Sequence, residues 1–284
     1  MTIFETSHCN PRERQDSPRD SEENGCQIWR TCSHLRSIVD PDGGLVLDLS
    51  TGRFHSLNRT SAVVWKALRD NPEGADSNEL LRAMTAAFGP NPGMGDDLHG
   101  LLQAFEHKGL VQRYPANDGT LDSFPRTPEI REKSMEKDGA VANPLQMPPK
   151  TEFDRAGSQV WWTSAAWLGF LVVNLILWMG GFPRLHQALS WLSATRRIGE
   201  PSQKKISTIC GAVNRAAALY LRKSWCLQRA AVTFSLLRLA GMPAEFVIGC
   251  RRLPFYCHAW IEVHRFVVND NARVKGLYPE LDRF

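Results

Sequence analysis

The stretch PANDGTLDSFPRTPEIREKSMEKDGAVANPLQMPPK, residues 115–150, constrains the fold more than any other feature of the chain. It has no apolar period and is rich in proline, glycine and charged residues, so it cannot bury enough surface to repay the entropy of ordering. Residues 1–27 have the same character and predict a disordered tail. Because 284 residues suffice for two ordinary domains, we predict folded units at residues 28–114 and 153–284, joined by a linker at 115–152.

The first unit shows strand signals followed by helix signals. The segments HLRSIV, LVLDLS and FHSL are separated by the turn sequences DPDGG and TGR, which is typical of a small antiparallel meander. Three helices follow: Asn58 caps the first, Asp76 and Glu79 form a capping box for the second, and Gly109 ends the third. The pattern predicts an α+β, winged-helix-like unit with three strands and three helices.

This unit has no nucleophile–base set and no metal-ligand spacing, so we interpret it as a binding module. DNA binding is one alternative, because helix-turn-helix proteins share this architecture. The third helix, however, contains Asp96, Asp97 and Glu106 against a single lysine, which disfavours contact with phosphates. A sheet edge that accepts a peptide strand fits the residues better, and we expect no nucleic-acid partner.

The second unit contains a cysteine at a predicted helix start, in RKSWCLQRAAVTFSLLRLAG. Apolar residues recur after Cys226 at helical spacing, and Gly241 ends the run. Ser224 can cap the first turn, which places the thiol among free N–H groups at the positive end of the helix dipole and favours the thiolate. The alternative is a plain core position, because a free cysteine usually behaves as a small buried apolar residue.

The segment YCHAWIEVHRFVVND follows downstream and reads as a strand and a turn. Period-two alternation places His258 on one face of the strand and Cys257 on the other. A zinc site built from Cys250, Cys257, His258 and His264 is therefore not expected, because its four ligands would have to converge on one point.

Asp270 follows His258 by twelve residues, and the length of the turn between them decides whether they meet. A two-residue turn would pair Asp270 with Ala259, on the wrong face. We therefore predict an odd loop, or a bulge near residues 263–265, which would place Asp270 opposite His258. A cysteine at a helix start with a histidine and an aspartate on paired strands matches the nucleophile, base and orienting acid of acyl transfer.

The cysteine count and the N-terminal residues bear on the cell compartment. The chain has seven cysteines, an odd number, and its opening residues lack the basic-then-apolar pattern of an export signal. We therefore expect a cytoplasmic protein with reduced thiols and no disulfide framework.

Residues 160–182, VWWTSAAWLGFLVVNLILWMGGF, contain no charged side chain and are long enough to span a membrane. Asn174, Thr163 and Ser164 interrupt the run, and its four tryptophans are not confined to the ends. We therefore favour a core helix, or docking on a membrane surface, over spanning. From Arg184 to Phe284 there are 16 lysines and arginines against 6 acidic residues, which suits an acidic partner or anionic lipid.

The segments SWCLQRA, LLRLAGMPAEFVIG, HAWIEV and VVND together resemble the leader peptidase of lasso-peptide biosynthesis, a cysteine protease with a transglutaminase-like, papain-like fold. The resemblance covers about residues 160–284 and implies a catalytic triad of Cys226, His258 and Asp270. Residues 32–114 resemble the PqqD-like recognition element of pathways that mature ribosomally made peptides (RiPPs). The chain therefore looks like a fusion of the two.

The resemblance also implies how the chain acts. The precursor's leader would lie beside the strand at residues 53–57, with the third helix as the other wall, and the peptidase would then cleave the leader off. An asparagine-synthetase-like macrolactam synthetase, using ATP and Mg, would join the freed amine to a side-chain carboxyl. The expected leader-binding residues are Arg53, Phe54, His55, Leu57, Leu98, Leu101 and Phe105.

The sequence contains no Walker loop or glycine-rich phosphate cradle, so we expect no cofactor in this chain. Two alternatives to a leader peptidase remain. One is another amidase- or transglutaminase-type acyl transfer by the same triad, since a fold does not fix the reaction. The other is a precursor-binding escort in which the triad residues are only structural.

Overall fold

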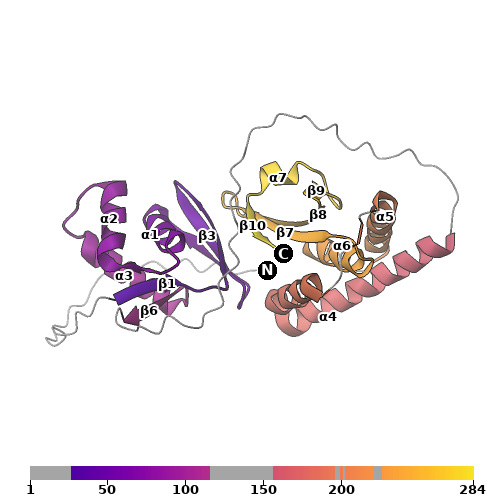
Figure 1. Cartoon of the computed structure of the whole chain (residues 1–284), viewed down its shortest axis with the longest axis horizontal. Helices are drawn as coiled ribbons and strands as arrows, with labels where there is room; N and C mark the ends of the chain where they lie inside the picture. The colour runs from indigo at the N-terminus through magenta and orange to yellow at the C-terminus, as the bar shows by residue number, and fades with distance from the viewer. Residues whose placement is uncertain (1–26, 116–155, 196–198, 201, 221–225) are drawn as a thin grey trace.

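The computed structural model describes residues 27–115, 156–195, 199–200, 202–220 and 226–284. The predicted tail up to residue 26, the predicted linker at 116–152 and the predicted helix cap Ser224 lie outside these ranges. Within them, the N-terminal part (indigo to magenta in Figure 1) and the C-terminal part (salmon pink through orange to yellow) each combine helices with antiparallel strands. The predicted α+β class is confirmed.

The meander and the helices of the N-terminal part follow the sequence signals closely. The strands pair in the order β2-β3-β4, and the side chain of Asn58 accepts a hydrogen bond from the Ser61 backbone N–H. Asp76 and Glu79 form the predicted capping box. The elements are β2 (Leu35–Asp40), β3 (Gly43–Asp48), β4 (Arg53–Leu57), α1 (Arg59–Asp70), α2 (Ser77–Phe88) and α3 (Met94–His107).

A second small sheet in this part was not predicted. Its order is β5-β1-β6, built from β1 (Gln27–Thr31), β5 (Ala75–Asp76) and β6 (Val111–Pro115). β1 and β6 come from the two ends of residues 27–115, so no local signal relates them.

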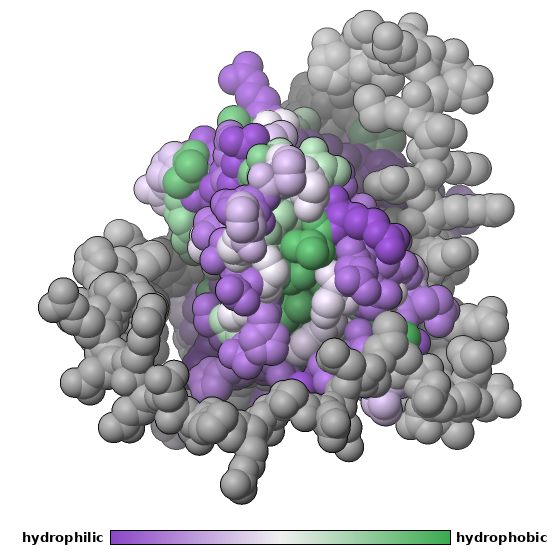
Figure 2. All heavy atoms as spheres, turned by 90° about the vertical axis from the view of Figure 1, so that its left-hand side faces the viewer, coloured by the Kyte–Doolittle hydropathy of each residue, from purple (hydrophilic) through white to green (hydrophobic). Residues whose placement is uncertain are grey.

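Figure 2 looks at the molecule from the N-terminal side, and the face in view is mostly hydrophilic with a narrow hydrophobic area.

Strand β3 is buried on both of its faces. Val46 points into the core of the N-terminal part, where it packs with residues of α1, α2 and α3. Leu45 and Leu47 point the other way and join the core of the C-terminal part. The β2-β3-β4 sheet therefore packs with one face against the helices of its own N-terminal part and with the other face against the C-terminal part.

The C-terminal part packs α6 against a four-stranded antiparallel sheet of order β10-β7-β8-β9, and α4 and α5 cover the other side of α6. Helix α6 is buried around most of its circumference because α4 and α5 contact it on one side and β7 and β8 on the other. The elements are α4 (Ala156–Thr195), α5 (Gln203–Leu219), α6 (Cys226–Leu239), β7 (Ala244–Arg251), β8 (Tyr256–Val263), β9 (Phe266–Val267), α7 (Val274–Leu277) and β10 (Glu280–Arg283).

Helix α4 contains the apolar run and is kinked at Gly181, where φ is 64°. One face is buried, through Ala166, Phe170 and Val173 before the kink, and the opposite face is exposed. The core-helix prediction therefore holds for one side only. Asn174, the amide within the run, points inward and hydrogen-bonds to the hydroxyl of Tyr220 on the chain after α5.

Candidate active site

Cys226 is the first described residue of α6, and its side chain is half-buried. The helix behind it is fixed by buried apolar residues on several sides, including Ala230, Phe234 and Leu237. The thiol therefore lies at the N-terminal end of a helix that is held in the core, where the backbone N–H groups of the first turn and the helix dipole favour a negative charge.

Strand β8 brings His258 to this thiol. Burial by itself raises the pKa of Cys226, but hydrogen bonds from His258 and from the backbone N–H of Ala259 outweigh it, so the pKa is lowered below its ordinary value. The same hydrogen bond with Cys226 is the main reason that the pKa of His258 is raised, and Asp270 adds to it against the effect of burial. Both shifts favour a thiolate beside an imidazolium.

Asp270 lies on the other side of the imidazole, with its Oδ2 2.8 Å from Nε2 of His258. Nδ1 is therefore the ring nitrogen left for Cys226. The structure brings together the three residues that the sequence predicted to meet. Among the described residues, no group of three or more histidine, cysteine or acidic side chains is arranged to hold a metal ion.

The route by which Asp270 arrives differs from the prediction, because the loop is not odd. His264 and Arg265 form a two-residue turn with φ values of 50° and 67°, and Val263 pairs directly with Phe266. Continued pairing in that register would place Asp270 opposite Ala259.

Regular pairing instead stops before Asp270 is reached. The β9 ladder ends at Val267, and the Val268 N–H still donates to the Ile261 carbonyl. Next, the side-chain oxygen of Asn269 accepts the Ile261 N–H at 2.7 Å in place of a backbone carbonyl. The chain leaves the strand at this point, which lets Asp270 reach His258. Sequence reasoning missed this role of Asn269.

Two aromatic rings stack near the imidazole of His258. Tyr278 lies 5.3 Å away between ring centroids at 26°, and Trp260 lies 6.4 Å away at 22°. Gly249 is the cross-strand partner of His258, and a Cβ there would lie 2.6 Å from Trp260 and 2.9 Å from Tyr278. Glycine is thus needed for the rings to approach the sheet. Tyr278 and Gly249 were not predicted, since their relation to His258 depends on tertiary packing.

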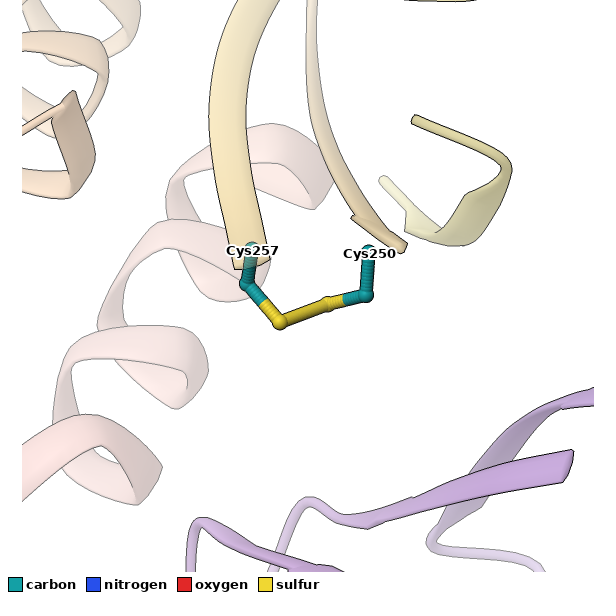
Figure 3. The surroundings of a disulfide bond; sticks show 2 residues. All are labelled: Cys250 and Cys257. Carbon is teal, nitrogen blue, oxygen red and sulfur yellow. A yellow bond between two sulfur atoms is a disulfide. The ribbon is translucent and has the colours of Figure 1, made fainter. Parts of the chain in front are cut away.

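Cys250 and Cys257 form a disulfide at the ends of β7 and β8 (Figure 3). This corrects the expectation of reduced thiols throughout. The two residues are direct cross-strand partners with Cα atoms 4.1 Å apart, a relation that a count of seven cysteines does not reveal. Among the described residues, Cys32, Cys210 and Cys226 are free.

The predicted leader-binding residues divide into two groups. Leu57, Leu98 and Phe105 are buried in the core of the N-terminal part, so placing them at a groove surface was wrong. Their apolar character serves packing of β4 and α3 onto the other elements. Arg53 is exposed, and His55 and Leu101 are half-buried.

Phe54 is the remaining member of the predicted set, and its side chain points toward the C-terminal part. It is exposed, and its ring contacts Phe255, just before β8 in the C-terminal part, at 5.3 Å between centroids. Sequence reasoning did not identify Phe255. Its contact with Phe54 joins the strand of the predicted leader groove to the hairpin that contains His258.

A surface hollow lies between the β3–β4 turn and the end of α3. The hollow is lined in part by Asp48, Ser50, Thr51, Glu106, Lys108 and Gln112. Lys108 also acts on His55 of β4: burial lowers the pKa of His55, and the positive charges of Lys108 and Arg53 lower it further, against the opposing effect of Asp48.

Two parts of the chain match known families. Residues 169–281 match the family described as Transglutaminase-like superfamily, and residues 43–111 match Coenzyme PQQ synthesis protein D (PqqD). No curated protein matches. The solved structure titled "TbiB1 in Complex with the TbiA(beta) Leader Peptide" is 25% identical, with a TM-score of 0.27, and the match covers 29% of this chain and 94% of that chain. The two family matches confirm the prediction that this chain joins a PqqD-like region to a transglutaminase-like region.

Proposed function

We propose that this chain binds the leader of a ribosomally made lasso-peptide precursor and removes it by Cys-His-Asp catalysis. The observation that best supports the proposal is the position of His258 between its two partners. Its imidazole is hydrogen-bonded to Cys226 and, through Nε2, to Asp270 at 2.8 Å. A histidine held in this way is able to accept a proton from a thiol and later donate it to a leaving group.

In the proposed reaction, the Cys226 thiolate attacks the carbonyl carbon of the scissile bond, and an electron pair moves to the carbonyl oxygen. The C–N bond then breaks, and the imidazolium of His258 gives its proton to the leaving amine. Water, deprotonated by neutral His258, attacks the thioester and releases the leader as a carboxylate. Asp270 orients the ring, and the Cys226 backbone N–H at the start of α6 donates to the oxyanion.

The leader is proposed to add as a strand to β4. This strand pairs with β3 on one side, and no other strand of the described residues pairs with its outer edge. Unpaired backbone N–H and C=O groups at a sheet edge are the groups that an extended peptide needs. The members of the predicted set that are not buried, and so remain accessible to contact its side chains, are Arg53, Phe54, His55 and Leu101.

The product of the proposed cleavage is a core peptide with a free N-terminal amine. That amine is a substrate for an amide-forming enzyme, which the sequence resemblance suggests to be an asparagine-synthetase-like macrolactam synthetase using ATP and Mg²⁺. We propose that this synthetase consumes the product and is a partner of the chain.

The test uses the full chain and the precursor peptide encoded closest to its gene. Wild-type protein is expected to give two fragments whose masses sum to that of the precursor plus one water. Cys226→Ala should bind the precursor and give no fragments. Cys210→Ala is the matched control, because Cys210 is a free cysteine on α5 that is buried, with a pKa raised to about 11, and it is not among the site's contacts.

Other outcomes would contradict the proposal in distinct ways. Cleavage by Cys226→Ala at the wild-type rate would exclude this cysteine as the nucleophile. Wild-type protein that binds the precursor and leaves it intact would favour the escort hypothesis. A product in which the leader's carbonyl is joined to an added amine, in place of water, would favour amide transfer.

A further inference from the structure

The outward side of α4 is a largely apolar surface, which we call the α4 stripe. Its members lie along one side of the helix over about 28 Å at 1.5 Å per residue, and the exposed hydroxyl residue Ser164 separates Trp161 from Trp167. In Figure 1, α4 runs along the lower edge of the C-terminal part, with α5 and α6 above it. The stripe consists of Val160, Trp161, Trp167, Leu168, Leu171, Val172, Leu175, Trp178 and Met179, each at least 40% exposed.

The apolar character of the stripe is more than a soluble surface helix requires. The segment Gln159–Ala194 is long and apolar enough to cross a membrane, and 17% of its most apolar 18-residue window is buried. A surface helix normally pairs an apolar inner face with a polar outer face. In α4 before the kink both faces are apolar, which points to a second apolar medium or partner on the outside.

The inner face of α4 makes contacts with the core that would be lost if the helix left it. Ala166, Phe170 and Val173 are buried there. The Asn174 amide donates to the Tyr220 hydroxyl at 3.0 Å and accepts from the Gln228 amide at 2.8 Å, and Gln228 is two residues from Cys226. Spanning a bilayer would break these contacts beside the candidate nucleophile, whereas lying flat on a surface keeps them.

The chemistry of the stripe favours lipid over protein as its partner. Protein interfaces form roughly one hydrogen bond per 100–200 Å², but this side of α4 offers few hydrogen-bonding groups, namely the indole N–H groups of the stripe's tryptophans and the hydroxyl of exposed Ser164. Its backbone is paired within the helix. Tryptophan is a preferred residue at the boundary between lipid tails and headgroups. Trp161 and Trp178 lie near the two ends of the stripe.

Positive charges flank the stripe and suit anionic headgroups. Arg184 is exposed and donates from Nη1 to the Met179 carbonyl at the end of the stripe. Arg215 on α5 is exposed and lies 3.4 Å from the Thr163 hydroxyl near the other end.

We propose that the α4 stripe docks the protein flat on an anionic lipid surface, with the tryptophans at headgroup level and the flanking arginines on lipid phosphates. This inference does not rest on the proposed peptidase activity. It assigns the exposed half of α4 a binding role that the triad does not need.

Sedimentation of the full chain with vesicles tests the proposal. Wild-type protein should pellet with vesicles of phosphatidylcholine and phosphatidylglycerol at about 3:1 and less with pure phosphatidylcholine. Leu175→Glu should weaken partitioning roughly tenfold or more, because an apolar contact is lost and a charge must be buried. Leu277→Glu is the matched control, since Leu277 is a similarly exposed leucine on α7, and it should bind like wild type.

Several results would overturn the proposal. The proposal is wrong if wild-type protein stays in the supernatant with both vesicle types. It is also wrong if Leu175→Glu and Leu277→Glu weaken vesicle binding to the same extent. Equal binding to the two vesicle types would refute the anionic surface, and resistance to an alkaline carbonate wash would show insertion in place of flat docking. A dimer by light scattering that dissociates in Leu175→Glu, without vesicle binding, would assign the stripe to a second copy of the chain.

Discussion

Replacing Asp270 by asparagine tests the proposed triad at the residue whose role depends most on tertiary structure. The carboxylate Oδ2 lies 2.8 Å from Nε2 of His258, and the two side chains are 36% and 21% exposed. The substitution keeps size and hydrogen-bonding capacity but removes the negative charge. We therefore expect the fold and leader binding to be unchanged and the chemical step to slow.

The size of the effect follows from the exposure of the pair. A partly exposed ion pair contributes up to about 1 kcal/mol, and a less well oriented imidazole adds to the loss. A barrier increase of about 1.4 kcal/mol corresponds to a tenfold lower rate. We expect the single-turnover rate of Asp270→Asn to fall about tenfold or more.

The same substitution should change the pH dependence of the rate. The hydrogen bond with Cys226 is the main cause of the raised pKa of His258, and Asp270 adds to it. Removing the carboxylate lowers that pKa, so the imidazolium loses its proton at a lower pH. The alkaline limb of the rate profile should therefore shift to lower pH in Asp270→Asn, which a purely structural role would not produce.

The assay is single-turnover cleavage of saturating precursor across pH, with melting temperature and leader affinity measured alongside. Asp70→Asn is a suitable control, because Asp70 is an exposed aspartate paired with Arg69 at the end of α1. A near-normal rate and an unshifted alkaline limb in a stable Asp270→Asn protein would reduce the catalytic set to Cys226 and His258.

Three further predictions concern packing and pH. Gly249→Ala should lower both the melting temperature and the cleavage rate, because the added Cβ would lie 2.6 Å from the Trp260 ring and 2.9 Å from the Tyr278 side chain, both beside His258. Burial opposes the lowered pKa of Asp282, but His186 and Arg36 outweigh it, so thermal stability should fall below about pH 4 and Asp282→Asn should flatten that fall. Residues 27–115 expressed alone should bind leader by titration calorimetry, and Leu45→Thr with Leu47→Thr should improve the fragment's solubility, because both leucines lose their C-terminal partners there.

Local signals in the sequence predicted local structure well. The cap by Asn58 and the capping box of Asp76 and Glu79 are contacts within three residues of chain, so the sequence contains all of their determinants. The same holds for the start of α6 at Cys226, where an apolar helix period begins. Cap chemistry and periodicity depend little on the rest of the molecule.

Features that depend on distant residues were predicted less well. Ile28 pairs with Tyr114 from the opposite end of the N-terminal part, and neither segment has strong alternation. The apolar run of Leu45, Val46 and Leu47 predicts an ordinary strand of a meander. A run without alternation is also the pattern of a strand buried on both faces, which is how β3 is found.

At the candidate site, residue identity was predicted better than side-chain direction. Cys226, His258 and Asp270 meet as expected, although a two-residue turn and the side chain of Asn269 bring them together in place of an odd loop. The groove prediction failed at Leu57, because this residue lies three positions, an odd number, from the exposed Phe54 and so points to the opposite face of the strand and enters the core. Packing decides which apolar side chains are available for binding.

The packing between the two parts bears on how the proposed leader site serves the proposed catalytic site. Arg36 on β2 pairs with buried Asp282 on β10 at 2.7 Å, and Phe54 on β4 contacts Phe255 beside β8. A flexible linker alone would raise only the local concentration of the scissile bond. A packed sheet also fixes direction, so a leader added to β4 would leave the recognition part at a defined position relative to Cys226. Orientation of this kind lowers the entropic cost of reaching the transition state, which tethering by itself does not.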